Sequence, residues 1–137
     1  MAALRYSRQR AAVVDALRAR RDHPTAEILY HALRQDHPTI SLGTVYRNLS
    51  LLESHGEVLR VRGQDGPDRY DGTTAPHDHL HCQRCGAIVD LTGLTYKIDL
   101  LAAQEAASRQ GSVVEGHQLS FIGLCGICAN LQREPAY

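Results

Sequence analysis

The chain has 137 residues and a formal net charge of zero, a length that suits one ordinary domain or two small ones with thin cores. The charge is unevenly distributed, because residues 1–66 hold ten Arg and seven acidic residues whereas residues 67–137 hold five basic and eight acidic residues. No apolar run approaches the roughly eighteen residues of a membrane span, and arginines interrupt the N-terminal stretch where a secretory signal would be apolar. These features favour a soluble cytoplasmic protein. The basic first half and acidic second half suggest two modules with different partners, nucleic acid being a candidate for the first; arginines that serve only solubility are the alternative.

Three amphipathic helices are predicted in the first half. Ser7 is a suitable N-cap for a helix through RQRAAVVDALRAR, and Thr25 begins a second helix in HPTAEILYHALRQD. A third helix, in ISLGTVYRNLSLLESHG, is capped by Ser41 and ended by Gly56, with Arg47 opposite its apolar side. The three apolar sides comprise Val13, Val14 and Leu17, then Ala26, Leu29 and Leu33, and finally Leu42, Val45, Leu49 and Leu52.

The stretch EVLRVRGQDGPDRYD, which follows, is typical of two short strands around a turn from Gly63 to Pro67. Three helices followed by such a hairpin describe a winged helix-turn-helix, whose third helix can enter the major groove of DNA. Arg47 would then pair with a guanine edge, and Tyr46 would contact a base or a phosphate. A small helical core with a solvated Arg47 explains the same pattern, so the helix pattern alone leaves both interpretations open.

All the cysteines lie in two C-x-x-C pairs, CQRC at Cys82 and Cys85 and CGIC at Cys125 and Cys128. Four thiolates at this spacing suit a tetrahedral structural zinc ion. The intervening segment contains a predicted helix, LTYKIDLLAAQEAASRQG, and a predicted strand, HQLSFIGL, so the zinc would join the two ends of a small α/β unit. Two disulfides or a redox-active pair are the alternatives, which a cytoplasmic location and the presence of two pairs disfavour.

The stretch APHDHLHCQRCGAIVD, which ends at Asp90, combines three histidines with two of these cysteines. In an extended segment the three histidines would project to one face and Cys82 to the other, which predicts two separate metal sites. His77 and His79 with the carboxylates of Asp71 and Asp90 would form a nitrogen and oxygen site suited to Fe(II) or Mn(II). A polar face that binds no ion is the alternative, and the clustering favours a ligand set.

The sequence resembles the ferric uptake regulator superfamily over nearly its whole length. The resemblance rests, in order, on RYSRQR, HPTAEILYHAL, PTISLGTVYRNLSLLESHGEV, RYD, HDHLHCQRCGAIVD and GLCGIC. It implies a homodimeric, metal-dependent transcription factor that binds double-stranded operator DNA. It also implies an α+β fold, with a winged-helix DNA-binding domain and hinge at residues 1–72 and a metal-binding α/β dimerisation domain at residues 73–137. By the same resemblance, Arg5 lies near a minor-groove or phosphate contact.

Within the superfamily the residues look most like those of the peroxide-sensing repressors. The sensory site of that branch has three histidines and two aspartates, and these fall here on His23, Asp71, His77, His79 and Asp90. Iron-sensing members typically have glutamate in place of the two aspartates. The resemblance therefore implies a repressor controlled by bound Fe(II) or Mn(II), in which peroxide oxidises a histidine ligand of Fe(II) at the place of His23 or His77. The alternative is a manganese- or iron-responsive regulator of metal uptake with the same ligands and no peroxide sensing.

Some positions depart from the family pattern. The helical segment that relatives carry before LRYSRQR is nearly absent, and a third ligand set would need ligands at Pro76 and Lys97 as well as at Asp78 and His117. We therefore do not expect that third site to be intact, and we expect His81 to be an accessory polar residue. An enzyme such as a zinc hydrolase or nucleobase deaminase is disfavoured, because HLHCQRC lacks the H-x-E arrangement and four cysteines can close the zinc site.

Overall fold

The computed structural model describes residues 4–63 and 66–133. The chain divides into two compact units, which we call unit 1 (Met1–Ala75) and unit 2 (Pro76–Tyr137). None of the helices in the described ranges combines the length and the apolar character that crossing a bilayer requires.

The three helices of unit 1 begin where the sequence places their caps. They are α1 (Arg8–Arg18), α2 (Ala26–Leu33) and α3 (Leu42–Ser54). Ser7, Thr25 and Ser41 each accept a hydrogen bond of 3.1 Å from the backbone N–H three residues later. Gly56, just after α3, has a φ of 72°, which glycine adopts without steric cost. The predicted helices and their caps are thus confirmed.

The core of unit 1 is formed by the apolar sides of these helices. Two departures from the prediction lie on α3, where Leu42 in the first turn is only half-buried and Asn48 is buried among the apolar residues. The buried core residues are Val13, Val14, Leu17, Ala26, Leu29, Leu33, Ile40, Val45, Leu49, Leu52, Val58 and Tyr70.

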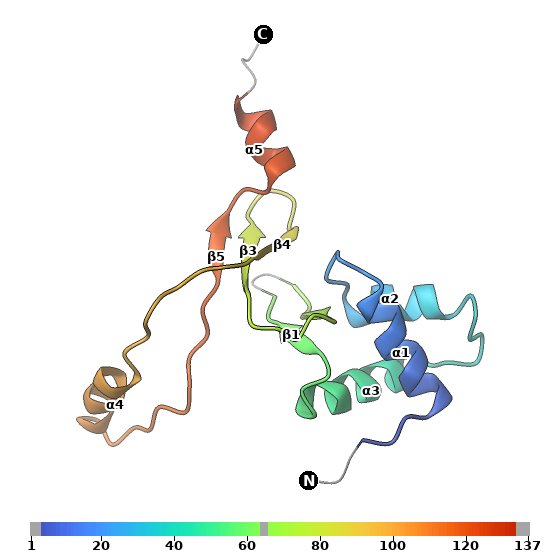
Figure 1. The fold of residues 1–137 in the computed structure, drawn as a ribbon, viewed down its shortest axis with the longest axis horizontal. Helices are drawn as coiled ribbons and strands as arrows, with labels where there is room; N and C mark the ends of the chain where they lie inside the picture. The colour runs from blue at the N-terminus through green and yellow to red at the C-terminus, as the bar shows by residue number, and fades with distance from the viewer. Residues whose placement is uncertain (1–3, 64–65, 134–137) are drawn as a thin grey trace. The chain divides into compact units, whose positions relative to one another are not determined.

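A two-stranded hairpin follows α3 (Figure 1). Strands β1 (Leu59–Val61) and β2 (Arg69–Asp71) are antiparallel, with Arg60 opposite Tyr70. Residues 64 and 65 of the predicted turn lie outside the described residues. The backbone N–H of Tyr70 donates to the carbonyl of Pro24 at 3.0 Å, which joins the hairpin to the segment before α2. Unit 1 is therefore a winged helix-turn-helix, as predicted, and we call the β1–β2 pair the wing hairpin.

Unit 2 contains a three-stranded sheet and two helices. The strands are β3 (Asp78–Cys82), β4 (Ile88–Leu91) and β5 (Phe121–Gly123), and the helices are α4 (Leu100–Ser108) and α5 (Gly126–Arg133). The strand order is β4-β3-β5, with β3 antiparallel to β4 and parallel to β5. The parallel pair requires a crossover, which contains α4. These elements confirm the α+β fold class.

Two predicted elements of unit 2 are shorter than the sequence pattern suggested. The helix LTYKIDLLAAQEAASRQG forms only from Leu100, because the side chain of Asp99 accepts a hydrogen bond of 2.8 Å from the N–H of Ala102 and so caps α4. The preceding segment is held instead by the hydroxyl of Tyr96, which donates to Asp78 at 2.7 Å. The strand HQLSFIGL is limited to β5, and α5 was not predicted.

Candidate metal centres and nucleic-acid interface

The four cysteines converge at one end of unit 2. Cys82 ends β3, Cys85 lies in the turn after it, Cys125 follows β5 and Cys128 lies in α5, and their ligand atoms are all within 4.8 Å of one another. The sulfur atoms of Cys85 and Cys125 are 3.7 Å apart, and all four thiols are free. Tetrahedral zinc with Zn–S bonds of about 2.3 Å places neighbouring sulfurs about 3.8 Å apart, whereas a disulfide needs about 2.05 Å. The cysteines therefore fit zinc and not disulfides.

The ionisation of these thiols also fits a bound cation. Backbone hydrogen bonds from Cys85 and Cys125 lower the pKa of Cys82 to about 6. A backbone hydrogen bond from Cys128 lowers the pKa of Cys125, whereas burial raises the pKa of Cys128 to about 12. The site thus stabilises its first thiolates and opposes the last one, since four adjacent negative charges need a positive ion among them. Zn²⁺ bound to all four sulfurs supplies that charge.

A second group of ligand atoms lies on the β3–β4 pair of the same unit. His79 and Asp90 are directly opposite each other across these strands, and His77 immediately precedes β3. The Nε2 atoms of His77 and His79 lie 3.2 and 3.3 Å from Oδ1 of Asp90. Neighbouring ligands of an octahedral divalent ion are about 3 Å apart. This unit-2 ligand set, His77, His79 and Asp90, therefore suits part of the coordination shell of Fe(II) or Mn(II).

Unit 1 holds a smaller group, which we call the unit-1 ligand pair. Nε2 of His23, in the loop before α2, lies 3.3 Å from Oδ2 of Asp71, at the end of β2. Both side chains are buried, with 3% and 7% of their surface exposed. The other carboxylate oxygen of Asp71 accepts a hydrogen bond of 2.8 Å from the N–H of Thr73, which fixes the orientation of the carboxylate.

His23 has an unusual backbone conformation. Its φ of 51° makes it the one described non-glycine residue with a positive φ, a conformation that costs roughly 1–3 kcal/mol and persists where the surroundings enforce it. Here β2 provides that restraint, because Arg69 donates to the carbonyl of His23 at 3.2 Å and Tyr70 donates to the carbonyl of the next residue, Pro24. In this conformation Nε2 of His23 lies against the carboxylate of Asp71.

The predicted DNA-contacting residues lie on exposed parts of unit 1. Tyr46 and Arg47 are exposed on α3 and line a shallow depression of about 460 Å³ together with Ser50, Leu51 and Ser54. The guanidinium of Arg47 donates only to the side chain of Thr44, at 3.1 Å, among its described hydrogen bonds. Arg5 is exposed before α1, and its carbonyl accepts a hydrogen bond from Arg10. An exposed helix face with an available arginine can reach base edges in a major groove.

Comparison with known proteins identifies the family. The model of the ferric uptake regulator family matches residues 1–122. The chain belongs to the ferric uptake regulator family. It is 35% identical over 132 residues to the peroxide operon regulator of Bacillus subtilis (strain 168), a match that covers 95% of this chain and 88% of that protein.

Solved structures agree with membership of the ferric uptake regulator family. The peroxide stress regulator of Campylobacter jejuni is similar with a TM-score of 0.58 and 33% identity, over 85% of this chain and 84% of that one. The ferric uptake regulator of Helicobacter pylori is similar with a TM-score of 0.66 and 26% identity, over 92% and 83% of the two chains. The likeness to the peroxide-sensing branch is confirmed. Members of the family are transcriptional regulators, so the expectation that the chain is not an enzyme is also confirmed.

Sequence reasoning missed two polar residues that organise the two units. Asn48 accepts a hydrogen bond of 2.9 Å from Nε of Arg10 and donates to the carbonyl of Thr44 at 3.0 Å. It thereby connects α3 to the segment that carries Arg5. The signal was present, because Asn48 is a polar residue within the apolar arc of α3. Tyr96, which binds the Asp78 carboxylate, had no comparable signal.

Proposed function

We propose that the chain is a metal-dependent transcriptional repressor that binds double-stranded operator DNA as a homodimer and responds to peroxide through bound Fe(II) or Mn(II). The observation that carries this proposal is the division of the nitrogen and oxygen ligands between the two units. The unit-1 ligand pair belongs to the unit with the exposed α3 face, and the unit-2 ligand set belongs to the other unit. The likeness to the Bacillus subtilis peroxide operon regulator supports the same function.

The division of the ligands gives a physical reason for metal control of DNA binding. An octahedral ion needs about six donors, and neither the two residues of unit 1 nor the three of unit 2 suffice by themselves. One ion held by His23, Asp71, His77, His79 and Asp90 would favour a single arrangement of the units. It would shift the population toward that arrangement by its difference in affinity for the two states. In a dimer, the favoured arrangement is the one in which both α3 helices meet successive major grooves.

The four-cysteine site has a different role in this proposal. Zinc there joins the end of β3 to the segment after β5 and to α5, which are distant in the sequence. Its binding free energy therefore contributes to the folding of unit 2 and is present whether or not the regulatory metal is bound. We assign structural zinc to Cys82, Cys85, Cys125 and Cys128.

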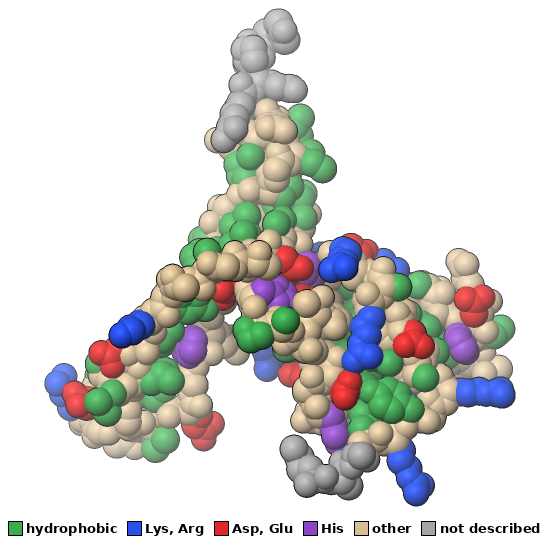
Figure 2. All heavy atoms as spheres, in the orientation of Figure 1, with side chains coloured by type: hydrophobic (Ala, Val, Ile, Leu, Met, Phe, Trp, Pro, Cys, Tyr) green, Lys and Arg blue, Asp and Glu red, His purple; other side chains and the backbone are tan. Residues whose placement is uncertain are grey.

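The surface of unit 2 supports the homodimer. Helix α4 has no buried residue although it is rich in leucine and alanine, and hydrophobic side chains are visible at the surface of this unit (Figure 2). Leu101, Val113, Ile122 and Ile127 are 73%, 76%, 57% and 74% exposed. Exposed apolar residues in this number are typical of a protein–protein interface. We therefore assign dimerisation to unit 2.

Bound Fe(II) supplies one-electron chemistry with peroxide, which Mn(II) does not. The residues of this chain determine which side chain is oxidised, and the family likeness assigns the oxidation to His23 or His77. Both imidazoles are nearly buried, with 3% and 4% of their surface exposed. Oxidation of either ring would remove a ligand from one of the two units and so release the constraint between them.

The alternative is a metal-uptake regulator with the same ligands and no peroxide response, a role favoured by the likeness to the Helicobacter pylori ferric uptake regulator. The test compares operator binding of the Fe(II)- and Mn(II)-loaded dimers before and after mild peroxide, with mass spectrometry of the peptides. Peroxide sensing predicts that only the Fe(II) form loses affinity and gains one oxygen on a peptide containing His23 or His77. Unchanged binding of the Fe(II) form supports the uptake regulator, and oxidation confined to the cysteines contradicts the proposed mechanism.

A further inference from the structure

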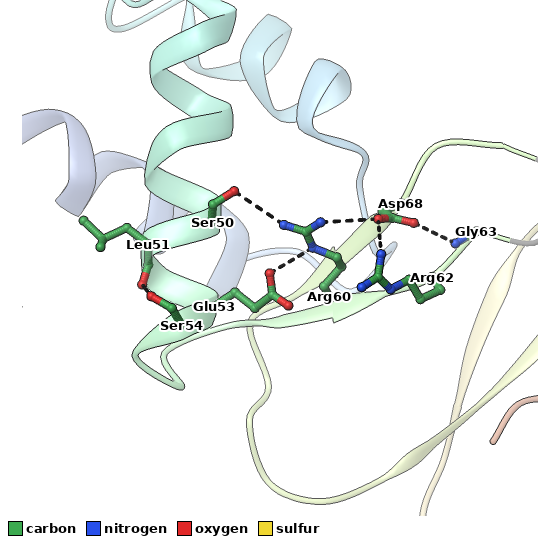
Figure 3. Close-up of polar contacts among 8 residues, drawn as sticks. All are labelled: Ser50, Leu51, Glu53, Ser54, Arg60, Arg62, Gly63 and Asp68. Atoms are coloured by element: carbon green, nitrogen blue, oxygen red, sulfur yellow. Dashed lines mark hydrogen bonds and ion pairs between the residues drawn. The ribbon is translucent and has the colours of Figure 1, made fainter. Parts of the chain in front are cut away.

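A network of charged side chains joins α3 to the wing hairpin (Figure 3). Nε of Arg60, on β1, lies 2.9 Å from Oε2 of Glu53, and its Nη2 donates to Oγ of Ser50 at 3.4 Å. Nη1 of the same guanidinium lies 3.5 Å from Oδ2 of Asp68, just before β2, and the guanidinium covers the ring of Tyr70 at 5.6 Å. Arg60 therefore fixes the hairpin relative to α3.

A second arginine, Arg62, shares the Asp68 carboxylate but is far more exposed. Arg62 is the first residue after β1 (Leu59–Val61), and its contact with Asp68 places its guanidinium on the same side of the hairpin as that of Arg60. Nη1 of Arg62 lies 3.5 Å from the same Oδ2 of Asp68. Its side chain is 62% exposed, against 23% for Arg60. A long, exposed and shared ion pair is weak, so a stronger anion can displace it.

The Asp68 carboxylate keeps other partners when the Arg62 guanidinium binds another anion. Its Oδ2 still has Arg60, and its Oδ1 accepts a hydrogen bond of 3.2 Å from the N–H of Gly63. The network also balances its charge, with two arginines against Glu53 and Asp68 (Figure 3). The hairpin can therefore release the Arg62 guanidinium without leaving a carboxylate unpaired.

The surface formed by Arg60 and Arg62 is continuous with the exposed face of α3. Ser50 lines the depression beside Tyr46 and Arg47, and the same Ser50 hydroxyl accepts the hydrogen bond from Arg60. The surface thus extends from Arg47 through Ser50 to Arg60 on β1 and, through Asp68, to Arg62. A duplex seated on α3 would carry its phosphate backbone along one side of this helix.

We propose that Arg62 binds a DNA phosphate from the wing hairpin, and that Asp68 competes with this phosphate when DNA is absent. The inference rests on the proposed function as a DNA-binding dimer. The chemistry is that of a guanidinium with a phosphodiester, which neutralises one backbone charge and releases its counterions.

The test is the salt dependence of DNA binding by the Mn(II)-loaded dimer, on a duplex that the parent protein selects from random sequences. A dimer with Arg62→Gln in both chains should lose two phosphate contacts. The magnitude of the slope of log affinity against log salt should then fall by about 1.8, since each phosphate contact contributes about 0.9. The ratio of parent to variant affinity should then change about twelvefold between roughly 50 and 200 mM salt. Arg62→Lys should retain the parent slope. Arg109→Gln, which removes the same charge from an exposed site after α4, should retain it too.

The competition by Asp68 is tested by a double-mutant cycle. Asp68→Asn keeps an oxygen for the Gly63 N–H but removes the charge, so it should raise DNA affinity at least twofold in the parent and leave the Arg62→Gln protein unchanged. The inference is overturned if Arg62→Gln keeps the parent slope, if Arg109→Gln lowers it equally, or if Asp68→Asn raises affinity equally in both backgrounds. Those outcomes leave the proposed function standing when Arg47→Ala still relaxes sequence preference. A parent protein that selects no duplex rejects both.

Discussion

At the scale of single residues, Asn48 shows how a buried polar side chain supports an exposed one. Its carboxamide holds Arg10 and the carbonyl of Thr44 beneath the α3 face, while Arg47 projects from that face with only the Thr44 side chain as its described hydrogen-bond partner. On α3, Asn48 therefore stabilises the structure, whereas Arg47 is available to contact DNA. Removing Arg47 should change DNA binding without changing the fold.

Arg47→Ala should weaken binding to the specific operator by about 1 to 3 kcal/mol and relax base preference, because a guanidinium paired with a guanine edge is lost. Competition binding against operator and random duplexes measures both effects, and thermal unfolding checks the fold. Equal affinities of parent and variant for both kinds of duplex would reject the assignment of Arg47.

His23→Ala tests the coupling between metal and DNA. Since His23 is one of only two proposed regulatory ligands in unit 1, its loss should leave zinc content and dimerisation intact while making DNA binding nearly independent of Mn(II). Operator titrations with and without Mn(II), together with zinc analysis, measure this. His31→Ala, at an exposed position of α2, should behave as the parent. A variant that still gains operator affinity from Mn(II) as the parent does would contradict a site shared by both units.

At the scale of elements, the sequence predicted the helices whose ends and apolar sides are specified by nearby residues. Helices α1 to α3 each have a Ser or Thr cap and a regular apolar side, so their beginnings could be read directly. The start of α4 depends on its N-cap Asp99, and β5 is a strand only where it pairs with β3. Such tertiary pairings leave no periodic pattern in a sequence.

The candidate site also has features that local sequence patterns predict and features that depend on distant contacts. The cysteine pairs and the clustered histidines are local patterns, and with two carboxylates they led to eight ligands, whereas His23 came only from the family resemblance. The positive φ of His23 and its restraint by Arg69 depend on a strand that is distant in the sequence. Asn48 could have been noticed as a polar residue on an apolar face, whereas the contact of Tyr96 with Asp78 depends on how the chain returns to β3.

Cys82→Ser should disrupt the part of unit 2 where β3, β5 and α5 meet, because serine does not supply the thiolate that zinc needs there. We expect zinc content to fall below one ion per chain, with loss of cooperative unfolding of unit 2 and of the dimer. Metal analysis, calorimetry and sedimentation measure these properties. His117→Ala, at an exposed position of the same unit, is the matched control. A folded Cys82→Ser dimer without zinc would refute the structural role.

At the scale of the whole molecule, the two units differ in what they leave exposed. Unit 1 has a closed apolar core with polar residues and arginines on α3 and the hairpin. Unit 2 buries few apolar residues apart from those around its cysteines and exposes many large ones. A chain of this kind is expected to be stable only as an assembly in which unit 2 is covered.

Leu101→Glu places a charge on α4 where the leucine is 73% exposed. Packing within the chain should not change, since Leu101 is exposed there, whereas a dimer that covers α4 should be weakened at least tenfold, because a carboxylate would be desolvated. Sedimentation velocity over a concentration series measures the dimer dissociation constant. Gln110→Glu adds the same charge at an exposed site beyond α4 and should have little effect. An unchanged dissociation constant for Leu101→Glu would show that α4 lies outside the interface.

The hydrogen bonds from β2 to the His23–Pro24 backbone give the wing hairpin a part in two equilibria. Arg62 immediately follows the first strand of the pair, and the second strand restrains His23, a proposed metal ligand. If duplex binding orders the hairpin, it also lowers the entropy that His23 must lose to bind an ion, so the DNA-bound protein should hold its regulatory metal more tightly. By the same reciprocity, a regulator that holds its metal would bind its operator more tightly than one without it. The fraction of the protein that holds regulatory metal at a given metal concentration would then depend on whether the protein occupies DNA.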